Sequence, residues 1–220
     1  MKRLKLFLLF FSLAIAVNAQ QEKPPFWDDV QAFKKEDSLH HPTKNSILFM
    51  GSSSFTKWKD VADYFPGYDI INRGFGGSTL LDQIRYVNNI VFRYQPRQIV
   101  IYCGENDLAG SDKVTGQIVY DRFVHLFKLI RQKLPNVPVV FISLKPSPSR
   151  WQLRDKMIAA NNKIKAYLAT KQHTAFVDVY HQMLNDEGLP KKEIYLDDSL
   201  HMNAKGYTIW QKELKPHLLK

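Results

Sequence analysis

The sequence of 220 residues is 45% hydrophobic and 24% charged, an ordinary globular composition that excludes collagen-like, low-complexity and disordered chains. Its formal net charge of +10 comes from Lys and Arg that are scattered over predicted helical faces without a basic block, so we expect a solvated surface and no nucleic-acid partner. The single cysteine, Cys103, excludes an internal disulfide and lies in the apolar run QIVIYCG, where a buried and inert thiol is expected.

Residues 1–19, MKRLKLFLLFFSLAIAVNA, have the features of a signal peptide. A basic start precedes an apolar run, and small residues stand before the cleavage position after Ala19. The apolar run from Leu6 to Val17 is shorter than the roughly 20 residues that span a bilayer. We therefore expect a secreted or periplasmic protein with no stable membrane span after cleavage.

The remainder of the chain divides into an N-terminal extension, 20–45, and a domain, 46–220. Apolar residues at Phe26, Val30 and Phe33 predict one amphipathic helix in the extension. In the domain, Val- and Ile-rich runs alternate with helical patterns; these runs are SILFM, YDIINRGF, RQIVIYCG, VPVVFISL and TAFVDVY. Strands without polar alternation are buried on both faces, so the pattern predicts an α/β three-layer sandwich with a parallel sheet.

Polar segments follow the first four runs directly, where the carboxyl edge of a parallel sheet places ligands. They are GSSS at 51–54, NRGFGG at 72–77, GEND at 104–107 and KPSPSR at 145–150. Ester hydrolysis by a serine needs a hydroxyl, a base, a group that orients the base, and donors for the oxyanion. Each segment taken alone is also explained as a turn or a helix cap.

Near the C-terminus, LDDSLH places Asp198 three residues before His201. This spacing lets the carboxylate hold the Nδ1 proton of the imidazole while Nε2 faces a partner elsewhere. The pair alone is more typical of a capping arrangement at the start of a helix. No His, Cys or acidic residues have metal-ligand spacing, so we expect neither a metal nor another cofactor.

In order, GSSS, NRGFGGST, GEND and DSLH resemble the blocks of the SGNH hydrolases, also called the GDSL family of esterases and acylhydrolases. The resemblance extends from Ile47 to Leu214 and implies a five-stranded, flavodoxin-like parallel sheet. It implies that Ser53 is the nucleophile, His201 the general base and acid, and Asp198 the group that orients it.

The same resemblance implies an oxyanion hole formed by the amides of Ser53 and Gly77 and the side chain of Asn106. One position departs from the family, because Ser52 stands where the GDS block has Asp. That Asp supplies none of the four catalytic requirements, so we interpret Ser52 as a tolerated variant. Asp107, which completes GEND, is expected to brace its loop.

These observations predict an exported serine esterase that removes a short, acetyl-type acyl group from a small-molecule, glycan or lipid ester. Lys145, Ser147 and Arg150 are candidates for the border of the substrate cleft, although a proline-stiffened loop with exposed charges explains them equally well. Two alternatives remain open: a lysophospholipase or thioesterase with the same residues, and a non-catalytic carbohydrate-binding protein on this scaffold.

Overall fold

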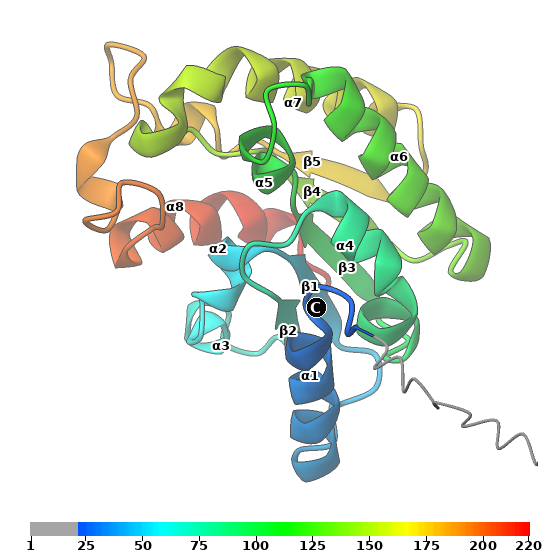
Figure 1. Cartoon of the computed structure of the whole chain (residues 1–220). Coiled ribbons are helices and arrows are strands. Elements are labelled where there is room, and N and C mark those ends of the chain that lie inside the picture. Colours follow the sequence, from blue (N-terminus) through cyan, green and yellow to red (C-terminus); the bar gives the residue numbers. More distant parts are fainter. Residues whose placement is uncertain (1–21) are drawn as a thin grey trace, which may run out of the picture.

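The computed structural model of the chain describes residues 22–220, so the predicted signal peptide and its cleavage point lie outside the described residues. Its centre is a five-stranded parallel sheet in the order β2-β1-β3-β4-β5 (Figure 1). The strands are β1 (Ile47–Gly51), β2 (Ile70–Gly74), β3 (Gln98–Tyr102), β4 (Val139–Ile142) and β5 (Thr174–Val177). This is the flavodoxin-like strand order, and the predicted fold class is confirmed.

The strands coincide with the predicted apolar runs, and both faces of the sheet are covered by other residues. Leu48 and Met50 of β1 point into one apolar core, and Ile47 and Phe49 into the other, all of them fully buried. Such two-sided burial explains why these runs are continuously apolar rather than alternating. Cys103, directly after β3, is a buried free thiol, as the sequence predicted.

Helices cover both faces and complete the three layers (Figure 1). The first core is covered by α1 (Trp27–Leu39), α4 (Leu80–Arg85), α6 (Gly116–Lys133) and α7 (Arg154–Ala169), and the second by α2 (Ser53–Thr56), α3 (Val61–Tyr64) and α8 (Ala204–Leu214). The short helix α5 (Glu105–Ala109) follows β3. The remaining helical turns are Asn88–Phe92, Pro148–Leu153, His181–Met183, Lys192–Ile194 and Lys215–His217.

Helix α1 occupies the place of the predicted amphipathic helix. A buried ion pair connects it to β2. Asp37 accepts hydrogen bonds from Arg73 Nη2 at 2.5 Å and from the Tyr94 hydroxyl at 2.8 Å. Arg93 Nε lies 3.3 Å from the same carboxylate. Burial of Tyr94 raises its pKa to about 12, so the phenol remains a hydrogen-bond donor. The helix is therefore joined to the sheet by a desolvated ion pair as well as by apolar packing.

The register of the sheet brings the segments of interest to one edge. Gly51 at the end of β1 is level with Gly74 of β2 and with Tyr102 of β3. The residues that follow these three strands therefore start from adjacent points at the carboxyl edge.

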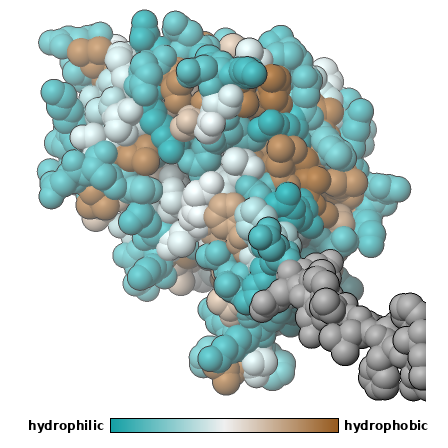
Figure 2. All heavy atoms as spheres, in the orientation of Figure 1, coloured by the Kyte–Doolittle hydropathy of each residue, from teal (hydrophilic) through white to brown (hydrophobic). Residues whose placement is uncertain are grey.

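The surface drawn in Figure 2 mixes hydrophilic residues with smaller hydrophobic patches. Among residues 22–220, no helix has both the length and the apolar character needed to cross a membrane.

Candidate active site

Ser53 is the first residue of α2, reached through a tight turn from β1. Gly51 has φ 150°, and a Cβ atom on it would lie 1.9 Å from the carbonyl oxygen of Tyr102. Only glycine fits such a close approach of two backbones. The turn places the Ser53 hydroxyl at the carboxyl edge of the sheet, at the start of a helix.

The turn is held in place from both sides. Asn72 Nδ2 of β2 donates to the carbonyl oxygen of Phe55 at 2.7 Å, and the Tyr207 hydroxyl of α8 donates to that of Ser54 at 2.8 Å. Tyr207 is itself fixed by stacking on the buried indole of Trp58, with ring centroids 4.7 Å apart. The position of the hydroxyl is thus set by β2 and α8, which lie far apart in the sequence.

Ser52, which replaces the Asp of the family pattern, satisfies the turn through its backbone. Its amide donates to the Tyr102 carbonyl oxygen at 3.1 Å, and its own carbonyl oxygen accepts the amides of Phe55 and Thr56. The Ser52 side chain does not cap α2. The turn therefore forms without a carboxylate at this position.

The structure brings together the three residues expected to carry the chemistry. His201 Nε2 lies 3.0 Å from Ser53 Oγ, and His201 Nδ1 lies 2.6 Å from Asp198 Oδ2. The second carboxylate oxygen, Oδ1, accepts the backbone amides of Leu200 at 3.0 Å and His201 at 2.9 Å. Ser199, between the acid and the base, has a left-handed φ of 53°, which curls the loop back on itself. This is the nucleophile, base and orienting acid arrangement of a catalytic triad.

The electrostatics of the pair favour a charged carboxylate beside the imidazole. Desolvation acts to raise the pKa of Asp198, but the hydrogen bonds from the His201 ring and from the amides of His201 and Leu200 outweigh it. The net result is a pKa of Asp198 well below its usual range. An Asp198 that is ionised at neutral pH keeps the Nδ1 proton in place and leaves Nε2 free to accept a proton from Ser53.

The loop that carries Gly77 runs beside Ser53, and Asn106 contacts the same loop. Gly77 has a left-handed φ of 82°. A Cβ placed on the preceding residue, Gly76, would be 3.8 Å from the Ser53 Cβ, so the loop runs alongside the serine. Asn106 Nδ2 donates to the Ser78 carbonyl oxygen of the same loop at 3.0 Å. Within residues 22–220, the amides of Ser53 and Gly77 donate to no protein acceptor.

Asp107 has the bracing contacts that were predicted for it. Its Oδ2 accepts the amide of Leu80 at the start of α4 at 2.9 Å, and its Oδ1 accepts Arg122 Nη1 of α6 at 2.7 Å. Desolvation is the largest influence on this carboxyl and raises its pKa despite these hydrogen bonds. Asp107 thereby ties the segment that carries Asn106 to two neighbouring helices.

The structure separates the three residues that were proposed for the cleft border. Lys145 is 1% exposed and its Nζ lies 2.8 Å from Glu105 Oε2, while Ser147 is fully buried. The prediction that these two border the cleft is wrong, because the loop after β4 turns their side chains inward. Arg150 is partly exposed, and its Nη2 donates to Asn106 Oδ1 at 2.9 Å.

Glu105 was not singled out from the sequence, although its position indicates a role. It is a buried carboxylate that accepts hydrogen bonds from the Tyr102 hydroxyl and from Lys145 Nζ. The sequence contained a signal for this role. Glu105 is an acidic residue that closely follows a buried strand and directly precedes the proposed oxyanion residue, Asn106. Glu105 links β3, the loop after β4 and α5 beneath the site.

A second Asp–His pair has similar local geometry but lies apart from the serine. His181 Nδ1 is 2.7 Å from Asp178 Oδ2, and the His181 amide donates to Asp178 Oδ1 at 3.2 Å. No serine hydroxyl among the described residues is hydrogen-bonded to this imidazole. Within residues 22–220, no group of three His, Cys, Asp or Glu side chains could hold a metal ion; the absence of a metal in the protein remains a prediction.

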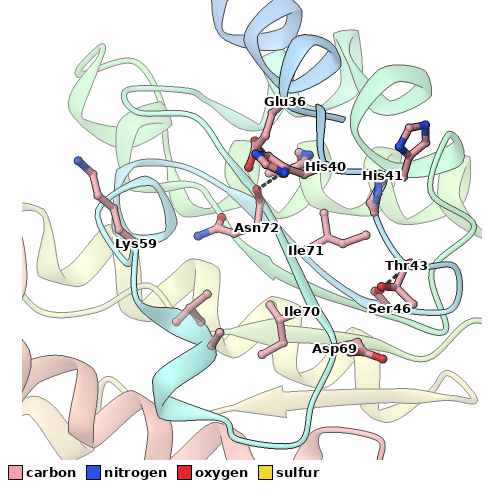
Figure 3. Close-up of a pocket in the computed structure, with 14 residues that line it drawn as sticks. Glu36, His40, His41, Thr43, Ser46, Lys59, Asp69, Ile70, Ile71 and Asn72 are labelled. Atoms are coloured by element: carbon pink, nitrogen blue, oxygen red, sulfur yellow. Dashed lines mark hydrogen bonds and ion pairs between the residues drawn. The ribbon is translucent and has the colours of Figure 1, made fainter. Parts of the chain in front are cut away.

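A pocket of about 350 Å³ lies elsewhere, along the outer edge of β2 (Figure 3). Glu36 and His40 from the end of α1 lie close together over Asn72 in this view, with Lys59 to their left. None of the side chains predicted to carry chemistry lines this pocket.

The strand order is that of a three-layer α/β sandwich, and Ser53, His201 and Asp198 have the relative positions of a Ser-His-Asp triad. The chain belongs to the GDSL-like Lipase/Acylhydrolase family, whose model matches residues 37–209. This membership supports an esterase or acylhydrolase activity. The boundary predicted at residue 45 remains a prediction.

Individual relatives are more distant. A solved structure of a proposed acylhydrolase from Bacteroides fragilis NCTC 9343 is 22% identical, with a TM-score of 0.75, and the match covers 89% of this chain and 97% of that one. A GDSL-like lipase from Bacteroides thetaiotaomicron VPI-5482 is also 22% identical, with a TM-score of 0.72 and coverage of 85% and 95%. At this identity the two structures show the fold alone.

Among curated proteins, the N-acylneuraminate cytidylyltransferase of Escherichia coli O18:K1:H7 (strain RS218 / NMEC) is 23% identical over 212 residues. The match covers 93% of this chain but 48% of the relative. The chain thus spans about half the length of that protein.

Proposed function

We propose that the protein is an exported serine esterase that cleaves short-chain carboxylic esters through an acyl-enzyme intermediate. The observation that carries the proposal is the 3.0 Å hydrogen bond between Ser53 Oγ and His201 Nε2, with Asp198 behind the imidazole. Export rests on the signal-peptide pattern of residues 1–19. Intact-mass measurement of the secreted protein should find Gln20 as the first residue, and a retained leader would contradict export with cleavage.

In the first half of the proposed reaction, Ser53 Oγ attacks the ester carbonyl carbon while its proton moves to His201 Nε2. The carbonyl π electrons move to the oxygen and produce a tetrahedral oxyanion. When the oxyanion collapses, the bond to the alcohol oxygen breaks, and His201 returns the proton to that oxygen. The alcohol leaves, and the acyl group remains on Ser53.

In the second half, a water molecule gives one proton to His201 and attacks the acyl-enzyme, and the proton returns to Ser53 as the acid leaves. The oxyanion of both halves is held by the amides of Ser53 and Gly77 and by the carboxamide of Asn106. Removing one such donor from an enzyme costs roughly 100- to 1,000-fold in kcat. The ionised Asp198 stabilises the imidazolium that forms in each half.

A short acyl group is favoured by the simple architecture of the domain. Residues 22–220 contain no lid domain inserted between the strands that would shelter a long acyl chain. The name of the curated relative contains a sugar, N-acylneuraminate, which supports a sugar as the part of the substrate that carries the ester. The N-acyl group in that name is an amide and says nothing about the ester bond. We therefore propose an acetyl-type ester, with acetylated sugars as the first natural substrates to assay.

The test is hydrolysis of a p-nitrophenyl ester series from acetyl to decanoyl by the wild type and by Ser53→Ala. We expect the highest kcat/KM at acetyl and loss of turnover in Ser53→Ala. A maximum at long chains would favour the lysophospholipase or thioesterase alternative. No turnover of any ester by the wild type would favour a carbohydrate-binding protein and reject the esterase.

A further inference from the structure

The orientation of the Asn106 carboxamide decides whether this residue can hold an oxyanion. Its nitrogen must face the site, because the oxygen end would repel a negative charge. In the structure, Oδ1 accepts from Arg150 Nη2 at 2.9 Å and Nδ2 donates to the Ser78 carbonyl oxygen at 3.0 Å. A carboxamide nitrogen has two protons, so one remains for the oxyanion.

These two contacts permit only one orientation of the carboxamide. A guanidinium has donors and no acceptor, and a carbonyl oxygen accepts and cannot donate. Turning Asn106 by half a rotation would place NH2 against the guanidinium of Arg150 and oxygen against the carbonyl of Ser78. Both hydrogen bonds would be replaced by repulsive contacts. Of the two partners, Arg150 is the one whose side chain a substitution can remove.

We infer that Arg150 is a positioning residue, which holds Asn106 with its NH2 group toward the oxyanion; this inference rests on the proposed esterase function. No substrate contact is required of Arg150 in this role. The guanidinium acts on the reaction through the carboxamide alone.

The guanidinium of Arg150 also lies near the buried carboxylate of Glu105. Its Nη1 lies 4.0 Å from Glu105 Oε1, an oxygen that is buried and accepts no hydrogen bond within residues 22–220. The other oxygen, Oε2, is 2.8 Å from Lys145 Nζ. Since an isolated carboxylate is costly to bury, the negative charge of Glu105 attracts both cations. Glu105 precedes Asn106 in the sequence, so its negative charge attracts the guanidinium toward the Asn106 side chain.

The segment that carries Arg150 also touches the loop of the proposed base. The Ser149 amide donates to the Ser199 carbonyl oxygen at 3.1 Å, and the Tyr195 hydroxyl donates to the Pro146 carbonyl oxygen. Ser199 lies between Asp198 and His201 in the sequence. The loop after β4 thus connects the oxyanion side of the site with the acid–base side, and Arg150 is its contact with Asn106.

A competing role for Arg150 is direct binding of an anionic substrate, because its side chain is 18% exposed. The two roles predict different kinetics. A positioning residue changes kcat for every ester, whereas a substrate contact changes KM for esters that carry a negative charge. Only a residue that acts through Asn106 loses its effect when Asn106 is already removed.

The experiment compares Arg150→Leu, Arg150→Lys, Asn106→Ala and the Arg150→Leu/Asn106→Ala double variant on neutral p-nitrophenyl acetate. We expect Asn106→Ala to lose roughly 100- to 1,000-fold in kcat and Arg150→Leu roughly 10- to 100-fold, with KM unchanged. Arg150→Lys keeps one donor and should recover part of the loss. The double variant should equal Asn106→Ala. Arg154→Leu, an exposed arginine nearby, is the matched control and should stay within about twofold.

A second measurement on the same variants records the side-chain amide signals of Asn106 in ¹H–¹⁵N NMR spectra. These signals are assigned by their absence from the spectrum of Asn106→Ala. We expect Arg150→Leu, but not Arg154→Leu, to shift these signals and speed their exchange with water. Unchanged signals, losses that add in the double variant, or an effect confined to KM of anionic esters would each overturn the inference. If the wild type hydrolyses no ester, the proposed function fails, and the NMR comparison still decides whether Arg150 positions Asn106.

Discussion

Replacing Asp198 by Asn should disable the proposed base while leaving the fold intact. The carboxylate Oδ1 accepts two backbone amides, from Leu200 and His201. In Asp198→Asn, the carboxamide oxygen takes this place, because an NH2 group would repel both amides. The NH2 group then faces His201 Nδ1, which lies 2.6 Å from the present Oδ2. The imidazole must carry its proton on Nε2, where it can no longer accept one from Ser53.

The size of the effect follows from the exposure of the carboxylate. A wrong tautomer enforced by a buried orienting residue costs about 10,000-fold in kcat in a serine protease. Asp198 is 46% exposed, so water can stabilise part of the correct tautomer. We therefore expect a loss of roughly 1,000-fold, equivalent to about 4 kcal/mol in the activation barrier. The assay is kcat for p-nitrophenyl acetate at the optimal pH of each variant, with thermal unfolding as a check on the fold.

The chain contains a matched control for this substitution. Asp178 holds His181 in nearly the same geometry, at 2.7 Å, without a hydrogen bond from that imidazole to a serine hydroxyl within residues 22–220. Asp178→Asn should stay within about twofold of the wild type in kcat, as expected of a surface substitution. More than a tenth of wild-type kcat in Asp198→Asn, or equal losses in the two variants, would refute the tautomer argument.

Two further predictions concern pH and stability. The pKa of Asp198 is lowered in the folded protein, so its carboxylate stays charged from about pH 5 to 8. The negative charge is lost only when the pH falls through that lowered pKa. Protonation of Asp198 should therefore add nothing to the acid side of the profile of log kcat/KM against pH in this range, and an acid slope of two would contradict this. Asp37→Ala should lower the free energy of unfolding by about 3–5 kcal/mol and the melting temperature by roughly 6–20 °C, since it removes the buried carboxylate that pairs with the buried guanidinium of Arg73 and leaves the exposed Glu36 in its place. Glu36→Ala removes a 56% exposed partner of the same arginine and should cost about 0–1 kcal/mol, so equal shifts in circular dichroism melts would contradict the buried-pair argument.

The fold could be predicted from the sequence because its signals are local. Each strand is a short run of apolar residues, and the alternation of such runs with helical patterns allows few architectures. Part of the candidate site could be found for a related reason. Parallel strands end at a common edge, so Ser53 and Asn106, which follow two neighbouring strands, had to lie near one another.

The surroundings of the site depend on side-chain directions that spacing does not determine. Lys145 and Arg150 are both basic residues in the same loop after β4, yet the first is buried on Glu105 and the second reaches Asn106. Which of them turns inward depends on the path of the loop across α5. The chain also has three Asp-x-x-His sequences, which begin at Asp37, Asp178 and Asp198. Only tertiary packing brings His201, rather than His40 or His181, to a serine hydroxyl.

The hydrogen bond between Ser53 and His201 joins residues that are 148 positions apart. Ser53 follows the first strand, whereas His201 precedes the last α-helix, α8, whose Tyr207 holds the serine turn. During synthesis, a chain that has left the ribosome only as far as β5 therefore contains the proposed nucleophile, Ser53. It lacks the proposed base, His201, and also Tyr207, which holds the serine turn. Catalytic competence should arise in one late step of folding, when α8 docks. Ester turnover would then report complete folding more directly than helix content, most of which precedes α8.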